Sequence, residues 1–168
     1  MESDRLLLRK AVPDDWPAMY RNVWSHPETF QHTWWEPSLT EEDAKDRILR
    51  TIAYQKARDS FFVIEKASGE PIGFAGVELA EDGVWEETGI CIGPAFTGKG
   101  YGKESLKILT DYCRRQSPGT LFRYRTFEEN TVSRRLALSA GFTQTGTEEV
   151  ADPRNGRKRI VLVFSKIL

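Results

Sequence analysis

The sequence lacks a long apolar run and lacks an excess of charge of either sign. None of its apolar stretches approaches the length of a membrane-spanning helix, and the N-terminus has no apolar core typical of a signal peptide. Its 24 lysines and arginines nearly balance 25 aspartates and glutamates, which gives a net charge of -1. A general nucleic-acid binder normally carries a basic excess. We therefore expect neither a membrane nor a nucleic acid as partner, and a cytoplasmic location.

Cysteine is scarce as well. The two cysteines, Cys91 and Cys113, lie in a strand pattern and a helix pattern, and no metal-ligand spacing surrounds them. The sequence therefore predicts no metal site and predicts that both thiols lie in the core. A nucleophilic role for Cys91 is disfavoured, because a thiol buried in a strand is inert.

Glycine, in contrast, is concentrated in one stretch. Gly98, Gly100 and Gly102 occupy every second position between an apolar strand pattern and a helix pattern. Glycine lets the backbone turn its N–H groups toward a ligand, with no Cβ in the way. Free N–H groups at a helix N-terminus favour an anion. The stretch therefore predicts a loop that binds phosphate or pyrophosphate, although a simple connecting turn is the alternative.

Two familiar phosphate motifs fit this stretch only in part. Residues 93–99 match the first seven positions of a P-loop, but Gly100 stands where the motif needs Ser or Thr to hold Mg²⁺. Counted from Gly98, the third glycine of a dinucleotide fingerprint would fall at Lys103. A P-loop kinase is therefore a distant alternative.

The 168 residues are enough for one domain with a hydrophobic core. Apolar runs and turn residues predict strands at residues 5–9, 61–64, 72–79, 84–92, 121–127 and 160–164, with extended chain from Phe142. Helices are predicted from Pro13 to about Ser25, after the N-cap Thr40, from the glycine loop to residue 117, and from the N-cap Asn130 to residue 141. Short loops predict an antiparallel meander over residues 61–92, and the next strand returns parallel after a helix. We expect a mixed α/β (α+β) single domain over residues 1–168, with helices flanking a central sheet.

This order of elements, with two motifs, resembles the GNAT superfamily of acetyl-CoA-dependent N-acetyltransferases over nearly the whole chain. One motif is similar to the family's Q/R-x-x-G-x-G/A segment, which cradles the coenzyme A pyrophosphate; here it is Thr97-Gly98-Lys99-Gly100-Tyr101-Gly102. The other is similar to the N-x-x-S…G-F segment, whose Asn contacts the pantetheine arm; here it is Asn130-x-x-Ser133 with Gly141-Phe142. Three further segments resemble the ribosomal-protein N-terminal acetyltransferase (Rim-type) branch: residues 5–9, 35–37 and 87–90. That branch also contains enzymes that act on small amines.

The resemblance implies that acetyl-CoA binds as co-substrate, and that the predicted sheet is mostly antiparallel, as in the family. The residues implied to bind it are Ile90, Cys91, Ile92, Thr97, Gly98, Lys99, Gly100, Tyr101, Gly102 and Asn130. The amides around residues 90–92 would polarise the acetyl carbonyl. Trp34 and Trp35 lie where the family places a substrate-facing loop, and they either wall an acceptor pocket or pack in the core.

The sequence departs from the family pattern at two positions. Thr97 stands where the motif usually has Arg or Gln, which puts one side-chain contact to the coenzyme in doubt. Ala137 stands where many members carry a Tyr that protonates the leaving thiolate. These departures motivate the alternative function of a coenzyme-A-binding sensor without catalysis.

Amine acetylation needs a general base, and Glu87 is the first candidate. It lies on the strand before the glycine loop, and apolar neighbours there would raise its pKa. The alternative is a solvent-facing strand residue beside Glu86. Ser133 either stabilises the leaving sulfur or caps the helix. Asp152 falls where some Rim-type members carry an acid, but it also begins the turn pattern Asp152-Pro153-Arg154-Asn155-Gly156.

Together these features predict an enzyme that transfers an acetyl group from acetyl-CoA to a primary amine. The acceptor is a protein N-terminal amine or a small-molecule amine. The catalytic residues are Glu87 and Ser133, with Trp34 and Trp35 at the acceptor. A monomer or a homodimer is expected.

Overall fold

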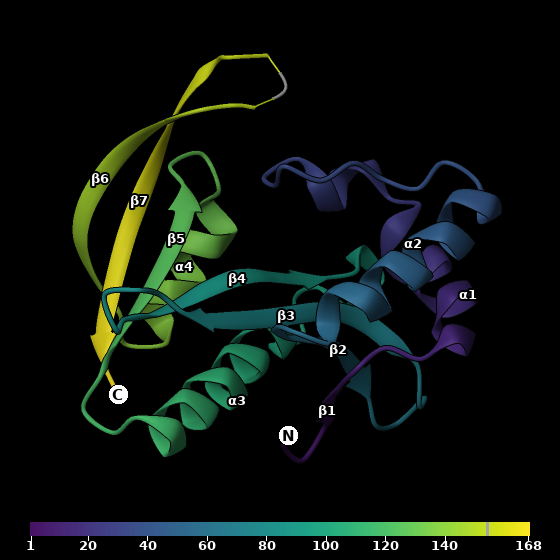
Figure 1. Ribbon diagram of the computed structural model, residues 1–168, viewed down its shortest axis with the longest axis horizontal. Coiled ribbons are helices and arrows are strands. Elements are labelled where there is room, and N and C mark those ends of the chain that lie inside the picture. The colour runs from purple at the N-terminus through teal and green to yellow at the C-terminus, as the bar shows by residue number, and fades with distance from the viewer. Residues whose placement is uncertain (154) are drawn as a thin grey trace.

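One sheet organises the chain. In the computed structural model, which describes residues 1–153 and 155–168, seven strands pair in the order β1-β2-β3-β4-β5-β7-β6 (Figure 1). The strands are β1 (Leu6–Arg9), β2 (Asp59–Glu65), β3 (Pro71–Leu79), β4 (Trp85–Ile92), β5 (Leu121–Phe127), β6 (Thr143–Ala151) and β7 (Lys158–Ile167). All neighbouring pairs are antiparallel except β4 and β5. The predicted mixed, mostly antiparallel sheet is confirmed. Of the turn predicted at residues 152–156, Arg154 lies outside the described residues.

Helices flank this sheet, and most of them begin where the sequence predicts. They are α1 (Trp16–Met19), α2 (Glu41–Gln55), α3 (Tyr101–Gln116) and α4 (Thr131–Ser139). The helix predicted from Pro13 to Ser25 is irregular: a 3-10 turn η1 (Pro13–Asp15), then α1, then a π-helical turn η2 (Tyr20–Trp24). Two prolines contribute, because Pro13 and Pro17 have no amide proton to donate to a regular helix. Two further 3-10 turns are η3 (Pro27–Phe30) and η4 (Pro94–Phe96).

Side chains fix the starts of α2 and α4. Thr40 Oγ1 accepts a hydrogen bond of 3.1 Å from the Asp43 N–H, and the Asp43 carboxylate accepts one of 3.0 Å from the Thr40 N–H. This reciprocal capping box satisfies two amides that the helix itself leaves free. At α4, Asn130 Oδ1 accepts from the Ser133 N–H at 3.0 Å. Both predicted N-caps, Thr40 and Asn130, are therefore confirmed.

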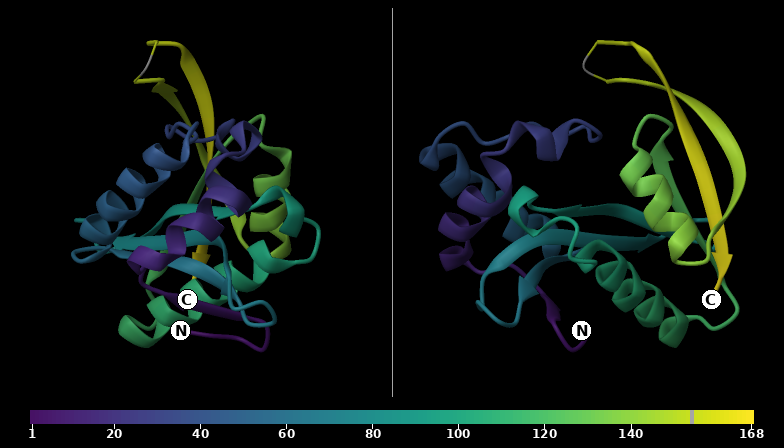
Figure 2. Two further views of the ribbon diagram at one scale, coloured as in Figure 1. Left: turned by 90° about the vertical axis from the view of Figure 1, so that its right-hand side faces the viewer. Right: turned by 180° about the vertical axis from the view of Figure 1, so that it is seen from behind.

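The two faces of the N-terminal half of the sheet carry separate cores. Val63 of β2 packs with Leu106 and Leu109 of α3, whereas its neighbours Phe62 and Ile64 pack on the other face in the cluster that contains α1 and α2 residues. Successive residues of a strand point to opposite faces, so one apolar run serves both cores. Figure 2 shows α2 and α3 on opposite sides of the sheet. No helix in the described part of the chain is both long and apolar enough to cross a membrane.

The sheet opens between its two halves. The parallel pairing of β4 with β5 consists of two pairs, Trp85 with Phe122 and Glu86 with Arg123. Beyond these pairs β4 continues to Ile92 and β5 continues to Phe127, and the two strands diverge (Figure 1). The C-terminal half, with β7 inserted between β5 and β6, therefore forms a second limb, and the sequence did not predict this divergence.

Candidate functional site

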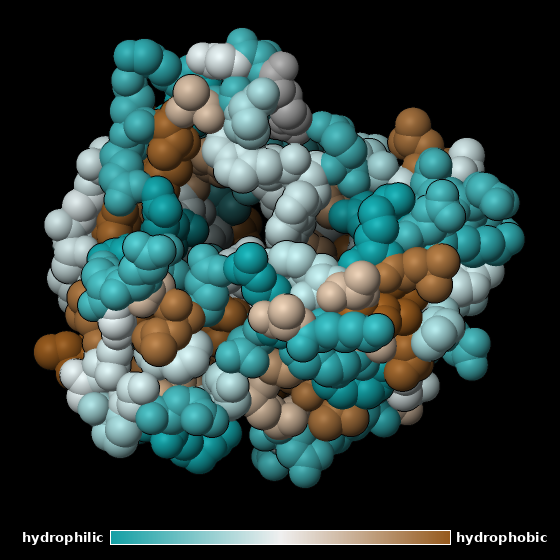
Figure 3. All heavy atoms as spheres, viewed as in Figure 1, coloured by the Kyte–Doolittle hydropathy of each residue, from teal (hydrophilic) through white to brown (hydrophobic). Residues whose placement is uncertain are grey.

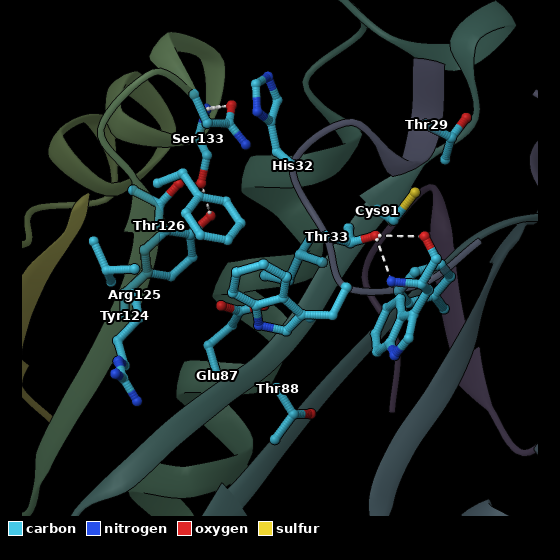
Figure 4. A pocket seen from close by; sticks show the side chains of 18 of the residues that line it. Thr29, His32, Thr33, Glu87, Thr88, Cys91, Tyr124, Arg125, Thr126 and Ser133 are labelled. Carbon is cyan, nitrogen blue, oxygen red and sulfur yellow. Dashed lines mark hydrogen bonds between the residues drawn. The ribbon is translucent and has the colours of Figure 1, made fainter. Parts of the chain in front are cut away.

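A cavity of about 850 Å³ lies where the strands diverge. Its walls come from β4, from β5 and the start of α4, from the segment 28–35, and from the β6–β7 hairpin. In the space-filling view a hollow separates the C-terminal strands from the N-terminal half of the molecule (Figure 3). Figure 4 shows side chains from both limbs turned into this space. The cavity is therefore built from parts of the chain that are distant in sequence.

A β-bulge shapes the β4 wall. Gly76 of β3 pairs with Gly89 and Val77 pairs with Glu87, so Thr88 is an additional residue without a partner. Such a bulge bends its strand and redirects nearby side chains. Glu87, in the middle of this irregular stretch, points into the cavity (Figure 4). The predicted base is thus placed on the cavity wall rather than on an outer, solvent-facing surface.

The surroundings of Glu87 favour its neutral form. Burial raises the pKa of Glu87 to about 8, and a hydrogen bond from the Gly89 N–H offsets this only in part. Among the described residues, no lysine or arginine forms an ion pair with Glu87. A group with a pKa near neutral pH is suited to accept and return a proton. Glu87 therefore has the electrostatic character of a general base.

We expect this raised pKa to make stability depend on pH. A carboxyl whose pKa rises from 4.5 to about 8 on folding takes up a proton as the chain folds. The resulting cost is absent below the ordinary pKa, grows as pH rises, and is complete above the folded pKa. Relative to wild type, Glu87→Gln should therefore gain on the order of 2–4 kcal/mol of unfolding free energy between about pH 5 and pH 9. Urea unfolding of both proteins at several pH values tests this, and a pH-independent difference would contradict it.

Two hydroxyls lie on the wall opposite Glu87. Tyr124 Oη of β5 is 2.8 Å from Ser133 Oγ of α4, and both residues line the cavity (Figure 4). Burial, together with the charge of Glu87, raises the pKa of Tyr124 well above its ordinary value. The phenol therefore keeps its proton and can donate it in a hydrogen bond. The sequence pointed to Ser133 but missed Tyr124, although period-two alternation along residues 121–127 places Tyr124 on one face with Phe122 and Thr126.

Ala137 stands where many family members carry the Tyr that protonates the leaving thiolate, so that a proton donor has to come from another residue of this chain. Its side chain has no hydroxyl and is fully buried in the core, and Ala137 does not line the cavity. Asp152 is also buried, and its backbone N–H and carbonyl bond to Arg157 and Gly156, each at 2.8 Å. The backbone of Asp152 thus holds the turn, and its neighbours Ala151 and Pro153 line the cavity.

Aromatic rings form the wall on the N-terminal side. Trp34 meets Phe127 edge to face with ring centroids 4.8 Å apart, and Trp35 meets Phe74 at 5.1 Å. Trp35 also covers Gly89, because a Cβ built there would lie 2.9 Å from the indole. Both tryptophans line the cavity and are partly exposed, so they are not ordinary core residues.

Two buried polar atoms lie on the same side of the cavity. Thr29 Oγ1 and His32 Nδ1 are buried, line the cavity and make no hydrogen bond to another described residue. Buried polar atoms are usually paired, so an unpaired one in a cavity marks a place for water or a ligand. Neither residue was predicted to have a role, and only the fold brings their unpaired atoms to the cavity.

The residues predicted to hold the coenzyme fall into two groups. Ile90, Cys91, Ile92 and Asn130 line the cavity. Residues 97–102 lie outside it: residues 97–100 form the exposed turn that leads from β4 toward α3, and Tyr101, which is buried, and Gly102 begin α3. A ligand that contacts both groups has to be long and extended.

The glycine turn has the properties of an anion site. Gly98 and Gly100 have φ values of 77° and 83°, a left-handed conformation that favours glycine. The N–H groups of Gly98, Lys99 and Gly100 donate to no other residue in the part of the chain that the structure describes. The Thr97 hydroxyl bonds within the turn, since its Oγ1 donates to the Pro94 carbonyl at 2.9 Å. The Tyr101 hydroxyl is also engaged in a hydrogen bond, because it donates to the Glu65 carboxylate at 2.6 Å.

The prediction of two core cysteines is correct only for Cys113. Cys113 is fully buried in α3, whereas Cys91 is partly exposed at the cavity wall, because the divergence of β4 and β5 uncovers this end of β4. Burial nevertheless raises the pKa of Cys91 to about 12. The thiol therefore stays protonated at neutral pH and is a poor nucleophile.

Comparison with known proteins places this geometry in a family. Residues 5–143 match the acetyltransferase (GNAT) domain family. The chain is 26% identical over 166 residues to the Bacillus licheniformis protein named uncharacterized N-acetyltransferase p20, covering 97% of this chain and 93% of that one.

Two solved structures share the fold. One is the Salmonella typhimurium acetyltransferase that modifies the N-terminal serine of ribosomal protein L7/L12, with a TM-score of 0.77, 22% identity and coverage of 99% and 96% of the two chains. The other is the microcin C7 self-immunity acetyltransferase MccE in complex with acetyl-CoA and AMP, with a TM-score of 0.81, 19% identity and coverage of 99% and 94%. The family match covers most of the chain, and the chain therefore belongs to the GNAT family and is an acetyl-CoA-dependent acetyltransferase.

Proposed function

We propose that the protein transfers the acetyl group of acetyl-CoA to a primary amine, with Glu87 as the general base. The observation that carries the proposal is the position of Glu87. Its carboxyl, with a pKa of about 8, lies in the cavity with the Tyr124–Ser133 hydroxyl pair on the opposite wall. A base and a proton donor that share one cavity fit acyl transfer to an amine.

Two features of this chain fit the coenzyme. The unpaired N–H groups of residues 98–100 would bind its pyrophosphate, and the exposed turn leaves room for it. Residues 90–92 and Asn130 would hold the pantetheine arm in the cavity, where Asn130 Nδ2 donates to no other described residue. The bound thioester supplies the acetyl group.

The protein side of the reaction then follows from three groups. Glu87 removes one proton from the acceptor ammonium, so that the nitrogen lone pair can form the new C–N bond. Amides at the end of β4 stabilise the negative charge that develops on the acetyl oxygen. As the C–S bond breaks, the Tyr124–Ser133 pair donates a proton to the leaving sulfur and recovers one from solvent. The nitrogen of the new amide still carries one surplus proton, and this proton passes to solvent together with the proton held by Glu87, so that one net proton is released.

The acceptor side of the cavity is aromatic with a few polar atoms. Trp34 and Trp35 would pack against the part of the acceptor next to its amine, and Thr29 and His32 would offer hydrogen bonds. A protein N-terminal amine is one candidate acceptor, because a structural neighbour modifies an N-terminal serine. A small-molecule amine is the other, since a cavity of about 850 Å³ accommodates one fully.

Thiol release from acetyl-CoA tests the proposal directly. The purified protein would be mixed with acetyl-CoA and a panel of amines that includes peptides with N-terminal serine or alanine, a polyamine and an aromatic amine. We expect saturable, amine-dependent thiol release together with an acetylated product by mass spectrometry. Tight acetyl-CoA binding with no turnover on any amine would instead support a coenzyme-A-binding sensor.

A further inference from the structure

Arg5 reaches the glycine turn from the other end of the sequence. It stands directly before β1, yet its Nη1 donates to the Lys99 carbonyl at 3.0 Å. Its guanidinium also covers the Tyr101 ring, 4.7 Å from the centroid, and lies 3.6 Å from the place of a Cβ at Gly100. Arg5 therefore contacts three consecutive residues of the proposed pyrophosphate turn, residues 99–101.

The same guanidinium binds a carboxylate in the first turn of α3. Arg5 Nε donates to Glu104 Oε2 at 2.8 Å, and Arg5 Nη2 donates to the same oxygen. Ser3 Oγ donates to the other oxygen, Glu104 Oε1, at 2.5 Å. Burial opposes ionisation of Glu104, but the hydrogen bonds from Ser3 and Arg5 outweigh it and hold the pKa of Glu104 below its ordinary value. Glu104 is therefore an anion at neutral pH.

An anion at this point would act against the turn's function. The first turn of a helix attracts negative charge through its free N–H groups, and Glu104 places a negative charge of its own in that turn. A pyrophosphate bound at residues 98–100 would also be repelled by Glu104. Arg5 cancels this charge, and it does so from a position that leaves the turn's N–H groups free.

We propose that Arg5 is a positioning residue for coenzyme binding: it neutralises Glu104 and holds the peptide at Lys99 so that the N–H groups of residues 98–100 face the pyrophosphate. The inference rests on the proposed function, because it assigns the pyrophosphate to this turn. It concerns the nucleotide end of the coenzyme, and the acetyl end at Glu87 is separate from it. Thr97 does not support the turn in this way, because its hydroxyl bonds to the Pro94 carbonyl. Arg5, which is distant in sequence, supports the turn instead.

The test compares two acetyl donors. For Arg5→Ala we expect the dissociation constant of CoA to rise about 10-fold, which corresponds to about 1.4 kcal/mol. Turnover of S-acetylpantetheine, which lacks the pyrophosphate, should change less than about twofold. Arg5→Lys should fall between the two, because it keeps the charge but loses the fork that binds Glu104 and Lys99 together. Calorimetric titration with CoA and steady-state kinetics provide the two readouts.

A double variant separates this role from simple loss of structure. In Arg5→Ala/Glu104→Gln the repelling charge is gone, so we expect part of the lost CoA affinity to return. Arg114→Ala is the matched control, since Arg114 forms a similar exposed ion pair with Asp111, at 2.8 Å, near the other end of α3. It should leave CoA affinity unchanged.

The outcomes distinguish the inference from the proposed function. If the wild-type protein binds CoA and Arg5→Ala binds it equally well, the inference is wrong and the proposed function stands. The inference is also wrong if Arg5→Ala lowers S-acetylpantetheine turnover as much as CoA affinity, or if the double variant regains nothing. If the wild-type protein shows no CoA binding, the proposed function itself fails.

Discussion

Glu87→Gln is expected to lower kcat/KM for amine acetylation by about 10²- to 10⁴-fold, the range that a general base contributes. The amide is nearly the same size as the carboxyl but cannot take the ammonium proton. Wild-type activity should rise with pH up to about 8, where Glu87 loses its own proton, and then level off. The variant should lose this inflection. Initial rates at saturating acetyl-CoA between about pH 6 and pH 9.5 measure both effects.

Glu81→Gln is a suitable control for this experiment. Glu81 lies in the exposed turn between β3 and β4 and does not line the cavity. Its substitution makes the same chemical change and should leave rate and pH profile unchanged. The affinity of Glu87→Gln for CoA should stay within about twofold of wild type, because Glu87 acts at the acetyl end. A Glu87→Gln enzyme with a wild-type pH–rate curve would remove Glu87 as the base.

Gly100→Val is expected to weaken CoA binding by at least about 100-fold, or about 2.8 kcal/mol. Gly100 has a φ of 83°, which a β-branched residue adopts only with strain. The turn would therefore rearrange and its N–H groups would no longer converge on a phosphate. Titration of CoA into the folded variant measures the loss.

A substitution just beyond the other end of α3 serves as the control for backbone strain. Gly119 has a φ of 76° and open space around a Cβ, so Gly119→Val introduces similar backbone strain away from the turn. It should lower the melting temperature while leaving CoA affinity within about twofold of wild type. A folded Gly100→Val protein with unchanged affinity would exclude residues 97–102 as the pyrophosphate site.

The features that could be predicted from the sequence are those that depend on residues close together in the chain. The N-caps Thr40 and Asn130 bond within three residues, so a local pattern predicts them. The glycine turn and the antiparallel meander are also local, and both are found where they were expected. Glu87 was identified from its strand and from the family resemblance, and the structure places it in the cavity.

Other features depend on contacts between distant segments, and local sequence patterns do not predict them. The pairing of Tyr124 with Ser133 needs β5 and α4 to pack at one register. The divergence of β4 from β5 leaves Cys91 partly exposed, although its apolar strand resembles a buried one. The unpaired atoms of Thr29 and His32 are recognisable only once the opposite wall is known.

The short pairing of β4 and β5 has a geometric consequence for catalysis. Because the limbs meet at two residue pairs, their junction is the vertex of an angle whose arms carry the reacting groups. Arg123 cross-links this vertex, since it binds Glu86 and, at 3.0 Å, Asp82. Glu87 follows Glu86 and Tyr124 follows Arg123 by one position, so both reacting groups lie next to this vertex. A misplacement of about 1 Å between reacting groups can cost about 10²-fold in rate. The spacing between the two walls thus depends on an ion pair at the base of the cavity, where its Glu86 also forms part of the lining.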